Sequence, residues 1–331
     1  MLLTSLMVLV IAGVTWAQTG NYTKLPAEEA GNIGVPLGKI AFIRDKNLMM
    51  MDWDGRNQQA LVEVGNADGK LSWAPDGRRV VFVRKGKYNY QSPDNMGGYR
   101  TLFDVFIGYL DSAATNTGFW RRISTDMGSR HPEWSADGSR IYLTKDQNAH
   151  LVDSPGPQYR TVIIDTIGNV ISTHGEYPKD GKIFEIMPTF GPNNYYAYVL
   201  VRDFNSVGVF ISPLDTKNLT AEEKKEKIKS IPGGYAPAWS PDGNWIAYLT
   251  KELSNQGIFI TRPDRSETYV VYRPTVGLDL QTYPLSWSPD SQWLTFATKD
   301  GAVWIVDITG NGLKQIVGPG MNSAPAWSKH K

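Results

Sequence analysis

The sequence Pro237-Ala-Trp-Ser-Pro-Asp-Gly243 places an aromatic residue, a small residue and a Pro-Asp-Gly turn before an apolar run, Trp245 to Thr250. Proline presets the φ angle of the turn, aspartate hydrogen-bonds the local backbone, and glycine accepts a positive φ. The run that follows has the β-branched and aromatic composition of a strand. This phrase therefore predicts a β-hairpin whose first strand ends in the turn.

Six versions of the phrase occur along the chain, and each carries one aromatic residue, which we call the anchor. The anchors are Trp73, Trp134, Phe190, Trp239, Trp287 and Trp327. Further strand-like runs follow most anchors, so each repeat predicts four antiparallel strands. Repeats of this length with four strands are typical of β-propeller blades. We therefore expect an all-β fold, a six-bladed propeller of four-stranded antiparallel blades.

The two ends of the chain complement each other. The last phrase has no further strands behind it, whereas residues 38–64 contain three strand-like runs with no leading phrase. We expect the C-terminal strand to complete the N-terminal blade, which would leave no open sheet edge at the seam. The predicted organisation is one propeller over 38–331, preceded by an N-terminal extension over 18–37.

The repeated Pro-x-Trp-Ser-Pro-Asp-Gly phrase with its following apolar strand resembles the TolB-like family of six-bladed β-propellers, over about residues 38 to 328. The resemblance implies the scaffold and says little about activity. TolB also carries a separate N-terminal α/β domain, which we expect this chain to lack.

Residues 1–17 are mostly apolar and end in Thr15-Trp-Ala17, a small-x-small pattern. They predict a secretory signal peptide cleaved after Ala17, with no membrane span in the mature protein. The chain has no cysteine, which excludes disulfides, thiol catalysis and a lipid anchor on cysteine. The net charge of +1 argues against nucleic acid as the main partner. We expect a periplasmic or secreted protein.

Polar and aromatic residues are predicted where the innermost strands begin, around the mouth of the central tunnel. They are Asp68, Lys70, Arg130, His131, Glu133, Glu185, Tyr235, Tyr283 and Asn322. Mixed charge and aromatic character on a concave rim favours binding of a polar partner. The alternative is that any propeller places polar residues where water enters its tunnel.

Two insertions are candidates for recognition. Residues 85–99 predict a polar, glycine-rich loop that carries Tyr88, Tyr90 and Tyr99, and tyrosine offers contact area plus a hydroxyl group. The alternative is a tolerated surface insertion. Thr220-Ala-Glu-Glu223 matches a capping box and predicts a short exposed helix, which we interpret as a solvated surface element and not as a recognition site.

No reaction is evident in the sequence. Only one of the four histidines, His131, falls on a predicted innermost strand, so the several-histidine metal site of propeller lyases that resemble this family cannot be assembled. Nucleophile-elbow, zinc-protease and phosphate-loop motifs are absent. We expect no cofactor, although carboxylates of Asp68, Glu133 and Glu185 would suit a Ca²⁺ ion if they converged.

The sequence thus favours a non-catalytic binding or scaffold propeller outside the cytoplasm that recognises a protein or cell-envelope component. A carbohydrate-active lyase or hydrolase at the tunnel mouth is one alternative, because paired carboxylates could be hidden among the acidic residues. A self-assembling structural subunit is another.

Overall fold

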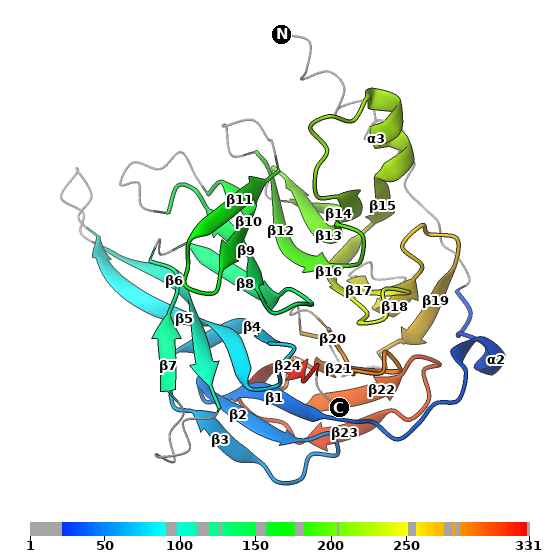
Figure 1. Cartoon of the computed structure of the whole chain (residues 1–331). Coiled ribbons are helices and arrows are strands. Elements are labelled where there is room, and N and C mark those ends of the chain that lie inside the picture. Colours follow the sequence, from blue (N-terminus) through cyan, green and yellow to red (C-terminus); the bar gives the residue numbers. More distant parts are fainter. Residues whose placement is uncertain are drawn as a thin grey trace.

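The structure is a computed structural model that describes residues 22–90, 98–110, 119–125, 128–149, 157–175, 182–203, 205–250, 256–274, 280–281 and 285–329. Its strands form six four-stranded antiparallel sheets arranged in a ring (Figure 1). The predicted six-bladed β-propeller is confirmed. Among the described residues, no helix has the length and apolar character needed to cross a membrane.

The blades follow one another in chain order, with one strand supplied from the C-terminus. The first blade contains β24 (Asn322–Trp327), β1 (Lys39–Arg44), β2 (Asn47–Asp52) and β3 (Gln59–Val62), and the second contains β4 (Ala67–Trp73), β5 (Arg79–Tyr90), β6 (Gly98–Tyr109) and β7 (Phe119–Arg122). The third blade contains β8 (Ser129–Trp134), β9 (Arg140–Asp146), β10 (Tyr159–Asp165) and β11 (Val170–His174), and the fourth contains β12 (Ile183–Phe190), β13 (Tyr195–Arg202), β14 (Asn205–Pro213) and β15 (Lys229–Pro232). The fifth blade contains β16 (Gly234–Trp239), β17 (Ile246–Thr250), β18 (Gly257–Thr261) and β19 (Thr268–Tyr272), and the sixth contains β20 (Ser286–Trp287), β21 (Trp293–Ala297), β22 (Val303–Asp307) and β23 (Lys314–Val317).

The ring closes as predicted, because β24 pairs with β1 in an antiparallel ladder that places Trp327 opposite Ile40. Beyond the ladder, the backbone N–H of Ser328 donates to Lys39 O at 2.7 Å, and Ser328 Oγ accepts from Lys39 N at 2.9 Å. The two ends of the propeller are therefore joined by backbone pairing within one blade.

The anchors join neighbouring blades by packing and by hydrogen bonds. In four blades, the side chain just before the anchor accepts a bond from the backbone N–H of the next anchor. The pairs are Ser72 Oγ with Trp134 N (3.1 Å), Glu133 Oε1 with Phe190 N (3.1 Å), Thr189 Oγ1 with Trp239 N (3.0 Å) and Ser286 Oγ with Trp327 N (2.8 Å). In the other two, the indole of the next anchor donates to an alanine carbonyl: Trp287 Nε1 to Ala238 O (2.9 Å) and Trp73 Nε1 to Ala326 O (3.0 Å). These contacts complete a circuit around the ring.

Four innermost strands contain a residue in the left-handed region three positions before the anchor. They are His131 (φ 50°), Met187 (φ 55°), Ala236 (φ 50°) and Ala324 (φ 49°). The strand pairing shifts register at each of these points. A proline follows in every case, and proline suits a strand edge because it has no N–H to donate. The proline of the repeated phrase thus marks the edge that borders the tunnel.

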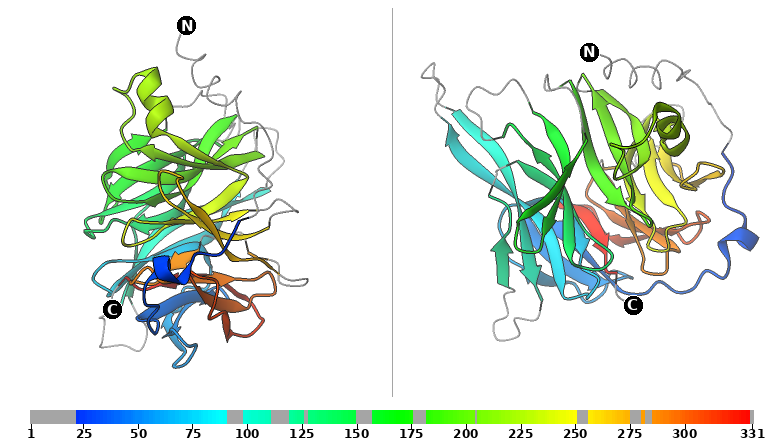
Figure 2. Two further views of the ribbon diagram at one scale, coloured as in Figure 1. Left: turned by 90° about the vertical axis from the view of Figure 1, so that its right-hand side faces the viewer. Right: turned by 45° about the horizontal axis from the view of Figure 1, so that its top comes forward.

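The prediction of a loop at residues 85–99 is wrong for residues 85–90 and 98–99, which form strands. β5 and β6 continue their ladder through it, pairing Tyr88 with Arg100, Asn89 with Tyr99 and Tyr90 with Gly98. The result is a long hairpin that extends beyond the ring (Figures 1 and 2). Residues 91–97 lie outside the described residues. The β-branched and aromatic residues at the base of the insertion continue the strand pattern, which overrides the glycines.

The second insertion forms α3 (Ala221–Lys227), and none of the residues of this helix is buried. The predicted capping box is confirmed, because Thr220 Oγ1 accepts from Glu223 N at 3.2 Å and Glu223 Oε2 accepts from Thr220 N at 2.8 Å.

The N-terminal extension, with α2 (Ala27–Ala30), runs across the outer side of two blades (Figure 2). Thr23 O accepts from Val270 N of β19 at 2.9 Å, and Leu25 is buried. Farther along, Gly34 O accepts from Trp293 Nε1 at 3.1 Å. The predicted signal peptide at 1–17 lies outside the described residues.

Candidate functional site

We call the end of the ring at which the innermost strands begin the entry face, and the opposite end, where the anchors lead into their turns, the exit face. The second strand of each blade ends at the entry face and the third strand begins there, because neighbouring strands are antiparallel. Asp68 and Arg130 lie near the starts of β4 and β8, as the sequence predicted.

Lys70 and Glu133 form an ion pair between neighbouring innermost strands. Both side chains are largely buried, with 9% and 13% of their surfaces exposed. Lys70 Nζ also donates to Pro188 O at 3.3 Å, and Glu133 Oε1 accepts from Thr189 Oγ1 at 3.2 Å as well as from Phe190 N. Burial opposes ionisation of Glu133, but the charges of Lys70 and Lys329 and these hydrogen bonds lower its pKa overall. The carboxylate is therefore ionised and held by three blades.

Lys329, which sequence analysis did not single out, belongs to the same cluster. Its Nζ donates to Trp134 O at 3.1 Å, two blades away from its own strand. The side chain retains contact with solvent, yet loss of surrounding water lowers the pKa of its ammonium group; Glu133 opposes this shift and Lys70 adds to it. We call Lys70, Glu133 and Lys329 the tunnel triad. The repeat pattern could not reveal it, because Lys329 lies beyond the last phrase.

His131 lies beside this triad and is mostly buried. Burial, with the charges of Arg130 and Lys70, lowers its pKa to about 3. Its Nδ1 lies 3.3 Å from Thr144 Oγ1. The imidazole is therefore neutral near pH 7 and does not take up a proton there.

Glu185 does not lie at the tunnel mouth, although the sequence placed it there. Its side chain is fully buried, and it accepts from Thr161 N at 3.1 Å and from Tyr196 Oη at 3.0 Å. Burial raises the pKa of this carboxyl group, whereas the hydrogen bonds oppose the shift. The strand start was predicted correctly, but the side chain points between two blades.

The remaining predicted rim residues differ in accessibility. Asn322 is buried and structural, because its Oδ1 accepts from Arg44 Nε at 2.8 Å and its Nδ2 donates to Gly301 O at 2.9 Å. Tyr235 is half-buried, and burial raises its pKa. Tyr283 lies outside the described residues.

The three carboxylates proposed as Ca²⁺ ligands each have their own surroundings. Asp68 Oδ2 lies 3.9 Å from Lys85 Nζ, Glu133 belongs to the tunnel triad, and Glu185 is enclosed between blades. Within the described part of the chain, no three histidine or acidic side chains gather in a metal-binding arrangement.

A row of cations and aromatic rings lies on the entry face between the second and third blades. The guanidinium of Arg130 stacks 3.8 Å from the ring centre of Phe103 and lies 5.7 Å from that of Tyr159. Lys85 Nζ lies 6.0 Å from the same Phe103 ring. Phe103, Arg130 and Tyr159 are partly exposed and Lys85 is exposed. We call these four residues the cation–aromatic row; the sequence identified only Arg130, because Phe103 and Tyr159 read as ordinary strand residues.

Similar pairs lie within single blades near the entry face. They are Arg44 over Phe42 (5.0 Å), Arg84 over Trp120 (5.0 Å) and Arg273 over Phe259 (5.5 Å). A guanidinium has a flat face that covers apolar rings while its edge stays polar. These side chains therefore close the aromatic core at the entry face and leave positive charge at its surface.

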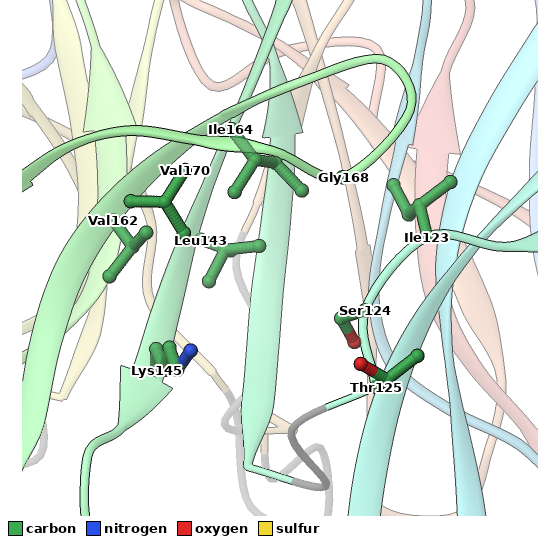
Figure 3. Close-up of a pocket in the computed structure, with 9 residues that line it drawn as sticks. All are labelled: Ile123, Ser124, Thr125, Leu143, Lys145, Val162, Ile164, Gly168 and Val170. Carbon is green, nitrogen blue, oxygen red and sulfur yellow. The ribbon is translucent and has the colours of Figure 1, made fainter.

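A small pocket lies between the second and third blades, beside β10 (Figure 3). Its volume is about 120 Å³, and its lining mixes apolar side chains with Ser124, Thr125, Lys145 and backbone polar groups. Pockets for cofactors and drug-sized ligands measure roughly 300–1,000 Å³, so this one suits only ordered water or a few-atom molecule.

No family model matches the chain. TolB from Acinetobacter baumannii is similar in structure, with a TM-score of 0.65 and 18% sequence identity, over 89% of this chain and 67% of that one. The Agrobacterium tumefaciens structure assigned to TolB has a TM-score of 0.56 and 12% identity, over 87% of this chain and 92% of that one. A chain of the nidogen/laminin complex has a TM-score of 0.58 and 10% sequence identity, over 88% of this chain and 99% of that one.

These identities are low, and the shared feature is the arrangement of blades. The chain therefore has a TolB-like six-bladed β-propeller fold.

Proposed function

We propose that this protein is a non-catalytic binding propeller that acts outside the cytoplasm and docks a protein partner on its entry face. The observation that carries the proposal is the cation–aromatic row, which lies at the base of the projecting β5–β6 hairpin. Aromatic residues and arginine are enriched in the energetically dominant parts of protein interfaces. A hairpin beside such a row offers a second contact surface.

The geometry of the tunnel favours binding over catalysis. A general acid needs a carboxyl group that keeps its proton near neutral pH, whereas the pKa of Glu133 is lowered. The other candidate carboxyl group, Glu185, is enclosed between blades. His131, with a pKa of about 3, is a weak base. These residues do not form the acid–base pair that the glycosidase alternative requires.

The fold is compatible with this role, since one similar solved structure is the nidogen/laminin complex, an assembly between proteins. The proposed location rests on the apolar N-terminal segment and the absence of cysteine.

Photo-crosslinking tests the docking face. A photoreactive amino acid at Lys85 is expected to capture a discrete partner from envelope extracts of the source organism. The matched control carries it at Leu313, which is 42% exposed and lies just before β23 of another blade. Equal products from both positions, or none from Lys85, would contradict the proposal.

Activity assays test the enzyme alternative. Turnover of a plant or bacterial polysaccharide that is lost in both Glu133→Gln and His131→Ala would replace a binding role by catalysis at the tunnel. We expect no turnover by the wild-type protein that these substitutions remove.

A further inference from the structure

Arg130 is held in place by rings and has no carboxylate partner among the residues that the structure describes. Its interactions there are the stacking contacts with Phe103 and Tyr159, and its buried Nε has no hydrogen-bond partner. Most surface arginines adopt many rotamers, so a stacked guanidinium loses less conformational entropy when it binds. Its terminal nitrogens form the rigid fork that matches a carboxylate.

A second cation reinforces this position. Lys85 lies over the same Phe103 ring, and its contact with Asp68 is long, at 3.9 Å, and exposed, with 51% and 31% of the two side chains accessible. An exposed ion pair of this kind contributes little and exchanges readily for another carboxylate. The row therefore carries more positive than negative charge, although the whole chain is nearly neutral.

We propose that the cation–aromatic row recognises carboxylates in an acidic segment of the protein partner, with Arg130 making the central bidentate contact and Lys85 a second one. This inference rests on the proposed function and specifies the chemistry of its partner. One observation favours an acidic peptide over a sulfated or phosphorylated polymer. The partly exposed Phe103 and Tyr159 rings flank Arg130 and suit apolar side chains between acidic ones.

A second stacked arginine, within the second blade, extends the same chemistry. Arg84 stacks on Trp120, and its buried Nε also has no hydrogen-bond partner among the described residues. Arg84 and Lys85 are adjacent on β5 where this strand crosses the entry face, so their side chains lie on opposite sides of the second blade and a segment that crosses this blade would meet both. We expect Arg84 to contribute less than Arg130, because a single ring holds it, at a greater distance.

The test uses fluorescence anisotropy with a labelled peptide of glutamate residues interrupted by phenylalanine, and a matched peptide with glutamine in place of glutamate. The full mature chain is expected to bind the glutamate peptide at low ionic strength and to bind the glutamine peptide at least about tenfold more weakly. Arg130→Gln is expected to weaken binding of the glutamate peptide by roughly 10- to 100-fold, which corresponds to loss of a charge-assisted contact. Arg130→Lys should give an intermediate loss, because it keeps the charge without the fork.

Lys225→Gln is the matched control, since it removes the same charge from exposed α3, away from the row. It should change the affinity less than about twofold, the range of a distant surface charge. Thermal midpoints of all variants show whether Arg130 substitutions act by unfolding; Arg130→Lys with a wild-type midpoint keeps the test valid if Arg130→Gln unfolds.

Several results would overturn the inference: no binding of the glutamate peptide, equal binding by wild type and Arg130→Gln, or an Arg130-dependent affinity that is higher for heparin than for the peptide. The proposed function fails separately. If crosslinking at Lys85 captures a protein that the glutamate peptide does not displace, docking on the entry face stands and carboxylate recognition is wrong.

Discussion

Glu133 accepts a hydrogen bond from the backbone N–H of Phe190 at 3.1 Å, the bond that a serine or threonine hydroxyl accepts at three other blade junctions. One carboxylate oxygen thus replaces a hydroxyl group in the circuit around the ring, and the other pairs with Lys70. These contacts give the Glu133 carboxylate a structural role in the tunnel. It also makes the tunnel triad a structural element whose energetics can be measured.

Glu133→Gln is expected to lower the free energy of unfolding by about 3 kcal/mol, because it leaves the largely buried Lys70 ammonium without its counter-charge. Urea titration measures the change. Lys70→Met combined with Glu133→Thr should be less destabilised than Glu133→Thr alone, since threonine fills this position in the next blade. Strictly additive effects of the two substitutions would show that the pair is not coupled.

His131 makes the protein less stable in acid. Its pKa is about 3 in the fold and near 6.5 when unfolded, so the unfolded chain binds more protons as the pH falls below 6.5. Between pH 6.5 and pH 5 this costs up to about 2 kcal/mol, since each pH unit contributes about 1.36 kcal/mol. His131→Asn, which tolerates the positive φ of 50°, should flatten the dependence of the urea midpoint on pH over this range. An unchanged slope would contradict the assignment.

Gly191 follows its anchor at a position where four of the other five phrases carry serine. A Cβ atom on Gly191 would lie 2.1 Å from the indole of Trp239, so Gly191→Ser is expected to cost at least about 1–3 kcal/mol despite matching the repeat. Thermal or urea unfolding measures this cost. The same substitution in a Trp239→Leu background should cost less, and an equal cost in both backgrounds would refute the clash.

Removal of the N-terminal extension should weaken the propeller. A chain beginning at Gly38 loses the buried Leu25 side chain and the bonds from Val270 N and Trp293 Nε1. We expect a loss of at least about 2 kcal/mol, the value of burying one leucine. Calorimetry against a chain beginning at Gln18 measures the effect, and equal midpoints would show that the extension contributes no stability.

The scaffold was predictable because its information is local and repeated. The Trp-Ser-Pro-Asp-Gly phrase specifies a strand end and a turn, and six copies specify the number of blades. The candidate site was predicted less well. Counting back from the anchors placed Arg130 and His131 correctly on β8, but it placed Glu185 in the tunnel, whereas its side chain lies between blades.

The number of blades, the closure by β24 and the capped helix α3 could be read from the sequence, because turn chemistry, strand composition and the mismatch of the two ends are visible along the chain. Which side chains meet across blades depends on the three-dimensional packing. Lys329 reaches Trp134 across 195 residues of sequence, and Arg130 stacks on Phe103 of the preceding blade. Those contacts depend on the bulges and twist that aim each side chain, and no local pattern encodes them.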